Sequence, residues 1–426
     1  MPPKIKVYQI GVGSFGRHSF EKLVDMHHHL GKVDLELAGV CDIHPEKLEI
    51  AKKYANTHDM ELETFRDEEK MYEEAKEAQE QDEEIMIYDA GPSESHAEHI
   101  YKSINHGFFH LAEKPPSMKR EERIHEKRLA KDKPFFWKVD FIERESPVVK
   151  KALDMIDDET NIDKIEIFRE STIAVQKILD PVHRSGVVGG DILDKMTHEI
   201  YVLDFLEKNG QRLNMNLEEA NTKCFIPFKK NSSNFMTVKG GKTSSINERT
   251  CTGKTQAVLD NGETKVKLHS SWVGISKEAS KIHEKHKNLA KDLIKSEINK
   301  ENQKLFSNEE ARFFRIKGSL NLLGDMLNGK LYDLDTGKEI ETPKLAHDQL
   351  YRVIEKAVLE AVNERESALK EEEVDIFMNS IFDIKDEVTS EEHNVYEELT
   401  KAREAINKKF MEFKDFETDS PEEIKG

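Results

Sequence analysis

The feature that most constrains the fold is a glycine-rich turn between a short apolar strand and a helix. Residues 4–10 carry apolar side chains at the spacing of a buried strand. The turn follows at once, and apolar residues at helical spacing come after it. In such a turn the first glycine permits the bend, the second lets a pyrophosphate approach the backbone, and the third lets helix and strand pack closely. We therefore predict a dinucleotide site that contains Gly11, Gly13, Ser14, Phe15 and Gly16.

Length and charge limit the remaining possibilities. A chain of 426 residues is too long for one hydrophobic core, so two domains are expected. Apolar residues make up 37% and charged residues 35%, which is polar but sufficient to build cores. The formal net charge of -19 should repel nucleic acids and anionic membranes. No apolar run approaches a membrane span and no signal peptide is recognised, so a cytoplasmic protein is expected.

Cysteine and histidine residues indicate no metal site. The three cysteines, at positions 41, 224 and 251, are far apart and form no C-x-x-C pair, so neither zinc nor a disulfide framework is expected. Three consecutive histidines occupy residues 27–29. Successive helical residues point about 100° apart, so these three cannot face one ion.

The second predicted strand, residues 35–40, ends before Cys41-Asp42. An acidic residue at this place can accept hydrogen bonds from the ribose hydroxyls of a dinucleotide. Ile43 follows, rather than an arginine or serine that could receive a 2′-phosphate, so we expect NAD to be preferred over NADP. The alternative is that Asp42 is an ordinary loop or cap residue, because His44-Pro45-Glu46 resembles a helix start.

Two further strands end near residues that can line a cofactor crevice. The strand at 85–90 is followed by Gly91-Pro92 and a helix that begins near His96. The strand at 108–112 is followed by Glu113-Lys114-Pro115. Strand ends on this side of a doubly wound sheet line the crevice, and a lysine there can reach a substrate. Taken alone, this tripeptide is common on protein surfaces.

A third motif lies in mid-chain, where Gly189-Gly190 precedes Asp194 and His198. The last two are four residues apart, so on a helix they share one face. A carboxylate and an imidazole held in this way form a plausible proton-handling pair. By itself such a pair is more often an exposed helix contact, so the argument for chemistry depends on the three motifs occurring together.

Together these motifs resemble the glucose–fructose oxidoreductase / inositol dehydrogenase / MocA family over roughly residues 4–365. The resemblance implies an NAD(P)-binding Rossmann domain and a second domain with a large open sheet that covers the cofactor. It implies hydride transfer between a nicotinamide and a sugar, polyol or sugar derivative, with a histidine that handles the alcohol proton. The catalytic residues that it implies are Lys114, Asp194 and His198, and further cofactor contacts are Pro92, His96, Glu113 and Lys114.

The chain also departs from the family pattern. Met196 stands where a glycine is frequent, Tyr201 where an aspartate is frequent, and Ile142 where an asparagine is frequent. These differences leave the substrate class open. Two alternative functions to a sugar or polyol oxidoreductase therefore stay open. One is a non-catalytic NAD-binding sensor on the same scaffold, and the other is a redox-neutral NAD-dependent enzyme that processes sugars.

The second half of the chain predicts an α+β domain with a mostly antiparallel sheet. Residues 164–175 alternate as in a strand, and an Asp260-Asn261-Gly262 turn joins two apolar runs as a hairpin. Residues 276–308 are predicted as an inserted exposed helix. We expect domains at 1–140, 141–365 and 366–426, the last a charged helical extension with an amphipathic helix from Thr389 onward.

The open sheet and several basic residues lead to two further expectations. An apolar sheet face that nothing covers is a liability, so a homodimer or homotetramer is expected. Four basic residues could line a cleft for an anionic sugar, although such residues more often form ordinary surface ion pairs. They are Arg144, Arg169, His183 and Arg184.

Overall fold

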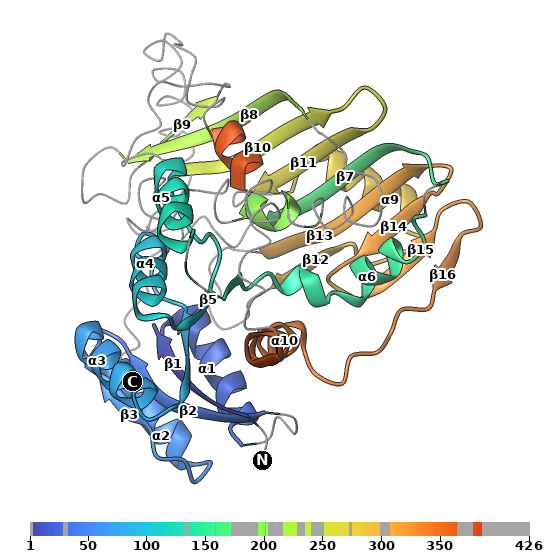
Figure 1. Ribbon diagram of the computed structural model, residues 1–426. Coiled ribbons are helices and arrows are strands. Elements are labelled where there is room, and N and C mark those ends of the chain that lie inside the picture. Colours follow the sequence, from blue (N-terminus) through green and yellow to red (C-terminus); the bar gives the residue numbers. More distant parts are fainter. Residues whose placement is uncertain are drawn as a thin grey trace, which may run out of the picture.

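Two β-sheets, one parallel and one mostly antiparallel, form the framework of the computed structural model (Figure 1). The structure describes residues 3–28, 33–131, 133, 136–157, 159–171, 195–200, 202, 216–227, 235–239, 251–271, 275–298, 307–363 and 378–385. Within these residues, no helix combines the length and the apolar character that crossing a bilayer requires.

The first sheet has six strands in the order β3-β2-β1-β4-β5-β6, and all its pairs are parallel. The strand order changes direction at β1, and ligands bind at such a switch point in open α/β sheets. The predicted doubly wound parallel sheet is thus confirmed. Its elements are β1 (Lys4–Ile10), α1 (Ser14–Met26), β2 (Asp34–Cys41), α2 (Pro45–Asn56), β3 (Glu63–Phe65), α3 (Glu68–Gln79), β4 (Glu84–Asp89), α4 (His96–His106), β5 (Phe109–Ala112), α5 (Arg120–Ala130) and β6 (Trp137–Val139).

Residues 61–84 are strongly charged, and such a composition predicts an exposed helix. The segment instead contains the three-residue strand β3 as well as α3. One face of α3 is buried against the sheet through Met71, Tyr72, Ala75 and Ala78. Four apolar residues at helical spacing are sufficient to dock a helix whose other positions are almost all charged.

The second sheet has ten strands in the order β16-β15-β14-β13-β7-β11-β10-β8-β9, and β12 pairs with β13. Only the β7–β11 pair is parallel, so the predicted mostly antiparallel sheet is confirmed. The elements that follow β6 in the chain are η1 (Ile142–Glu145), α6 (Pro147–Leu153), β7 (Ile162–Ser171), β8 (Asn216–Pro227), β9 (Phe235–Lys239), β10 (Cys251–Asp260), β11 (Lys265–Ser271), α9 (Lys277–His286), β12 (Ile294–Ile298), β13 (Ser307–Gly318), β14 (Leu322–Asp325), β15 (Lys330–Asp333), β16 (Lys338–Ile340) and α10 (Gln349–Asn363).

The hairpin around Asn261 is confirmed, because β10 and β11 pair in antiparallel register across it. The Asn261 side chain accepts hydrogen bonds from two backbone N–H groups of the turn, and Gly262 takes a left-handed φ of 89°. The inserted segment that follows is only partly as predicted. It holds α9, but it also holds the strand β12, which extends the sheet beside β13.

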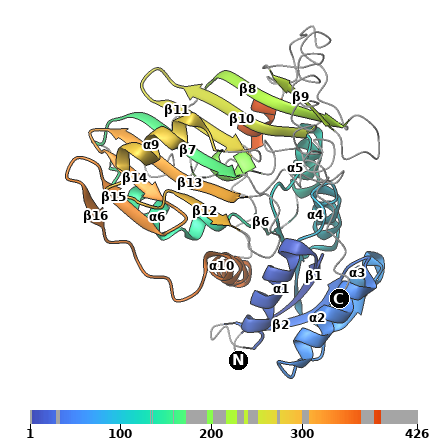
Figure 2. The ribbon, with the colours of Figure 1, turned by 180° about the vertical axis from the view of Figure 1, so that it is seen from behind.

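The two faces of the second sheet have different neighbours. Ile165, Ile167 and Phe314 belong to a core that also includes Ile100 and Ala112 of the first domain. Alternate residues face the other way and pack under α9, which Figure 2 shows on the face turned from the first sheet. A side chain on β7 or β13 can therefore be assigned to one face by its position along the strand.

Two helices near the C-terminal end of the described chain contact the first domain. Ile354 and Val358 of α10 share a core with Leu23 of α1, so this helix covers the first sheet (Figure 1). Residues 378–385 form a further short helix, and Asp383 within it pairs with Arg120 at 2.9 Å. The amphipathic helix predicted from residue 389 lies outside the described residues.

Candidate functional site

The carboxyl ends of the parallel strands meet at one edge of the first sheet. The last residues of five strands pair in one row: Cys41, Ile10, Asp89, Ala112 and Val139. The residues that follow this row are Asp42, Gly11, Ala90, Glu113 and Asp140. The predicted glycine turn and the predicted Glu113-Lys114 loop are thus brought to the same edge.

The glycine turn is held by close backbone approach and by one buried side chain. Gly11 has φ 80°, and a Cβ there would lie 2.4 Å from the Ala90 carbonyl oxygen. A Cβ on Gly16 would lie 2.3 Å from the Gly11 carbonyl oxygen. The buried Gln9 amide donates to the carbonyls of Gly11 at 2.8 Å and Gly16 at 2.6 Å. The turn therefore has the tight form that a pyrophosphate-binding turn needs.

Asp42 lies at the end of β2, as predicted, but its carboxylate already has partners. It accepts hydrogen bonds from the backbone N–H of Val12 at 3.1 Å and of His44 at 2.9 Å. Lys47 Nζ lies 3.5 Å from Asp42 Oδ2, and only 8% of Asp42 is exposed. Asp42 thus connects the glycine turn to the start of α2, as the alternative interpretation of a loop residue predicts, and its contact with a ribose stays a prediction.

A pocket of about 650 Å³ lies beside the turn, between α1 and α2. Its lining includes Gly13, together with three basic residues that the sequence analysis did not single out: Arg17, His18 and Lys47. Phe15, the second residue of α1, has 39% of its surface exposed, and Ser14 is described only in its backbone. The pocket and Phe15 thus lie beside the predicted dinucleotide-binding turn.

His96 connects the two loops that border the crevice. Its ring is 1% exposed, with Nδ1 2.8 Å from the Pro115 carbonyl oxygen and Nε2 3.1 Å from the Gly91 carbonyl oxygen. The side chain predicted to contact the cofactor therefore also ties the loop after β4, which contains Pro92, to the loop that carries Lys114. This contact helps to fix the backbone next to Lys114.

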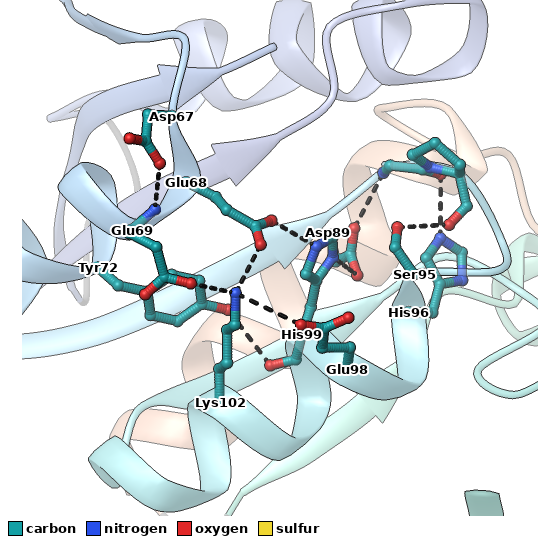
Figure 3. Close-up of polar contacts among 12 residues, drawn as sticks. Asp67, Glu68, Glu69, Tyr72, Asp89, Ser95, His96, Glu98, His99 and Lys102 are labelled. Atoms are coloured by element: carbon teal, nitrogen blue, oxygen red, sulfur yellow. Dashed lines mark hydrogen bonds and ion pairs between the residues drawn. The ribbon is translucent and has the colours of Figure 1, made fainter. Parts of the chain in front are cut away.

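A buried charge network supports the loop after β4 (Figure 3). His99 Nδ1 lies 2.8 Å from Asp89 Oδ2, and Nε2 lies 2.8 Å from Glu68 Oε2. Burial opposes the charged ring, but the two carboxylates outweigh it and raise the pKa of His99 to about 10. The hydrogen bond from His99, with help from Lys102, lowers the pKa of Glu68 to about 2. The network is thus an ion cluster at neutral pH, and it joins α3, α4 and β4.

His198 lies opposite this edge and is held by a carboxylate that the sequence analysis missed. Its Nδ1 is 2.7 Å from Glu143 Oε2, and Arg169 donates to the other oxygen of the same carboxylate. Burial and the positive charges of Arg169 and Lys114 lower the pKa of His198 to about 3, although Glu143 opposes them. His198 is therefore neutral, its Nδ1 carries the proton, and Nε2 can accept one.

The charge of Lys114 acts on His198 and also on a second group of buried acids. The Tyr88 hydroxyl donates to Asp140 Oδ2 at 2.6 Å and is 3.3 Å from Glu113 Oε1. Burial raises the pKa of both carboxyls, with added repulsion from Asp140 at Glu113 and from Glu143 at Asp140, while the Lys114 charge lowers the pKa of each. Two adjacent carboxyls in such a place share a proton rather than both ionising. Glu113 is thus a buried, hydrogen-bonded group behind the lysine.

The predicted catalytic residues are described only in part. Lys114 and His198 are brought close enough to influence one another electrostatically. Asp194 and the Gly189-Gly190 pair lie outside the described residues. Glu143 supplies the carboxylate next to His198, and no local pattern marks it, because the two are 55 positions apart. In the part of the chain that the structure describes, no cluster of three metal-binding side chains occurs.

Comparison with known proteins supports the family resemblance. Residues 5–141 match the Gfo/Idh/MocA family model, described as an oxidoreductase family with an NAD-binding Rossmann fold. No curated protein matches the sequence. The first domain is therefore similar to the NAD-binding domain of this oxidoreductase family.

Solved structures share the fold over nearly the whole chain at low identity. A UDP-N-acetylglucosamine 3-dehydrogenase from Acidithiobacillus ferrooxidans is 15% identical, with a TM-score of 0.58 over 90% of this chain and 98% of that one. A 3-ketoreductase from Actinomadura kijaniata, in complex with NADP and TDP-benzene, is 14% identical, with a TM-score of 0.59 over 91% and 98%. A levoglucosan dehydrogenase in complex with NADH is 12% identical, with a TM-score of 0.61 over 91% and 98%.

The charge network around His99 gives a prediction about stability and pH. The pKa of His99 is raised on folding, so the charged ring stabilises the folded protein. Its contribution to the free energy of unfolding is complete below about pH 6.5 and is lost as pH rises through about 10. The pKa of Glu68 is lowered, so its contribution is lost as pH falls toward about 2. We expect His99→Gln to lower the free energy of unfolding at pH 7 by roughly 3 kcal/mol, the scale for breaking a buried ion pair.

Urea unfolding from pH 5 to pH 10, followed by circular dichroism, measures this effect. The difference between the two proteins should shrink steadily as pH rises above about 6.5 and should be largely lost by pH 10. The matched control is His58→Gln, which replaces an exposed histidine. This variant should have the same free energy of unfolding as the parent at every pH. A His99→Gln protein as stable as the parent at pH 7 would contradict the assignment of the network as an ion cluster.

Proposed function

We propose that this chain, an oxidoreductase with the NAD-binding domain of the Gfo/Idh/MocA family, transfers a hydride between a nicotinamide cofactor and a hydroxyl-bearing carbon of a sugar or polyol. The observation that carries the proposal is the group of Lys114, His198 and Glu143 beside the edge where the glycine turn lies. The dehydrogenase and ketoreductase activities of the similar structures support the same reaction class.

The residues at the site fit a dinucleotide. A Cβ on Gly13 would meet only Lys47 Nζ, at 3.5 Å, so the backbone there is open to a ligand, and the carboxyl edge of the sheet is the usual position for such a ligand. A bound oxidised nicotinamide would supply the hydride acceptor. We assign Gly11, Gly13 and Gly16 to the pyrophosphate, and Asp42 with the α1–α2 pocket to the adenosine.

The protein's own residues would handle the proton. In the oxidation direction, His198 Nε2 takes the proton of the substrate hydroxyl as the C–H bond gives up its hydride and the carbonyl forms. Glu143 keeps the proton on Nδ1 and stabilises the imidazolium that results. Lys114 would hold the substrate oxygen through an N–H donor, which stabilises negative charge developing there. Reduction runs through the same contacts in reverse.

The roles of His198 and Lys114 can be tested by substitution. We expect His198→Ala to lower turnover about a hundredfold or more, the usual scale for losing a general base. Cofactor affinity, measured by quenching of protein fluorescence, should change little, because the glycine turn is untouched. Lys114→Ala should lower turnover similarly and also raise the Michaelis constant, because it removes a substrate contact. Near-normal turnover by either variant on a verified substrate would refute the role of that residue.

Cofactor preference gives a second test. The Asp42 carboxylate should repel a 2′-phosphate, so we propose that NAD binds more tightly than NADP. Asp42→Ala should narrow the difference. Lys47→Ala should widen it, because it removes the cation that partly offsets Asp42. Titration with both cofactors measures the ratio, and tighter binding of NADP by the unmodified protein would contradict this preference.

We further propose that the protein is a homodimer or homotetramer, because a large open sheet is stabilised by burial against a second copy. Multi-angle light scattering at micromolar concentration should give at least twice the mass of one chain. A monomer mass across the concentration range would refute the proposed assembly.

A further inference from the structure

Two arginines lie directly opposite one another in the second sheet. Arg169 of β7 pairs with Arg312 of β13 in antiparallel register, so both side chains leave the same face. Like charges in this arrangement destabilise a sheet unless something compensates them. The charge of Arg169 is the main reason that the pKa of Arg312 is lowered, so the two guanidinium groups are close in space.

This arginine pair belongs to the face that carries the candidate site. Arg169 lies an even number of residues from Ile165 and Ile167, so its side chain leaves the same face of β7. The side chains of these two isoleucines join the core shared with the first domain. It also donates to Glu143, the carboxylate that holds His198. The Arg312 side chain is 34% exposed, so part of it is open to a ligand from solvent.

Each arginine of the pair has one described carboxylate beside it. Glu143 is the carboxylate beside Arg169, and Glu310 Oε1 lies 2.5 Å from Arg312 Nε. Lys195 lies on the same face, where it donates to the Ser171 hydroxyl. An arginine has five N–H donors, and one carboxylate occupies only part of them. In the described part of the chain, both arginines thus have donors beyond those that face their carboxylates.

We propose that Arg169 and Arg312 bind the anionic group of the substrate, a carboxylate or a phosphate carried by the sugar. The proposal rests on the proposed function, because it places this group beside the carbon that meets His198. Arginine forks suit either oxyanion.

Arg312 is the better residue for a test, because Arg169 also holds Glu143. The cofactor-loaded full chain is assayed with matched sets of a neutral sugar, its uronate and its phosphate, such as glucose, glucuronate and glucose 6-phosphate, across several sugar configurations. We expect one anionic class to have the lower Michaelis constant. Arg312→Gln should raise that constant by about tenfold to a hundredfold, the range for hydrogen bonds to charged groups, with far less effect on turnover. Arg312→Lys should restore part of the affinity.

The matched control is Lys317→Gln, which removes a positive charge from the same strand on the opposite face and should leave all constants unchanged. Calorimetry of uronate and sugar-phosphate binding to the same variants separates this proposal from the reaction itself. Binding that depends on Arg312 without turnover supports the anion site and contradicts the proposed function. Equal affinity for neutral and anionic sugars, or an Arg312→Gln protein that binds the anion as the parent does, overturns the anion site.

Discussion

The candidate site depends on one buried carboxylate at the junction of the two domains. Glu143 lies in η1, just after the last strand of the first sheet, and it is 5% exposed. It accepts hydrogen bonds from His198 and from Arg169 of the second sheet. A charge buried in this way is stable only while its partners stay in place, because an unpaired buried carboxylate is very costly. Three segments far apart in the sequence are therefore held in one arrangement, and the tautomer of His198 is fixed with them.

Other buried polar contacts hold the loops of the first domain that border the candidate site. His96 joins the loops after β4 and β5, and the His99 ion cluster fixes the first of these loops to two helices. Behind Lys114, Tyr88 binds two carboxyls that share a proton. These groups are expensive to bury, and apolar side chains of similar volume would stabilise a sheet edge as well or better. Their concentration beside one strand edge is typical of a functional site.

Much of the framework could be predicted from local patterns. The glycine turn, the parallel strands and the Asn261 hairpin follow from steric demands that act over a few residues. The strands β3 and β12 were missed, because both are short and lie in strongly charged segments whose composition favours exposed helices.

The contacts of the site were harder to predict than the framework. Glu143 could not be linked to His198, and Glu68 could not be linked to His99, because sheet pairing and domain packing create both contacts. Local sequence patterns mark the side chains that we propose to act on a substrate, but not the side chains that hold them in place. Asp42 illustrates the difference, since its place was predicted and its engagement with Val12 and Lys47 was not.

The central claim is that a hydride moves between a substrate carbon and a nicotinamide held over His198 and Lys114. The most direct measurement incubates the cofactor-loaded protein with sugars and sugar acids deuterated at each carbon in turn, and analyses the nicotinamide by mass spectrometry. A redox-neutral enzyme would return the label to the sugar, so the reaction is also quenched during the first turnover, while the nicotinamide is still reduced. We predict one deuterium on the reduced nicotinamide from one labelled carbon, and none with His198→Ala. Tight cofactor binding with no deuterium transfer from any substrate would contradict this account and favour a non-catalytic NAD-binding sensor.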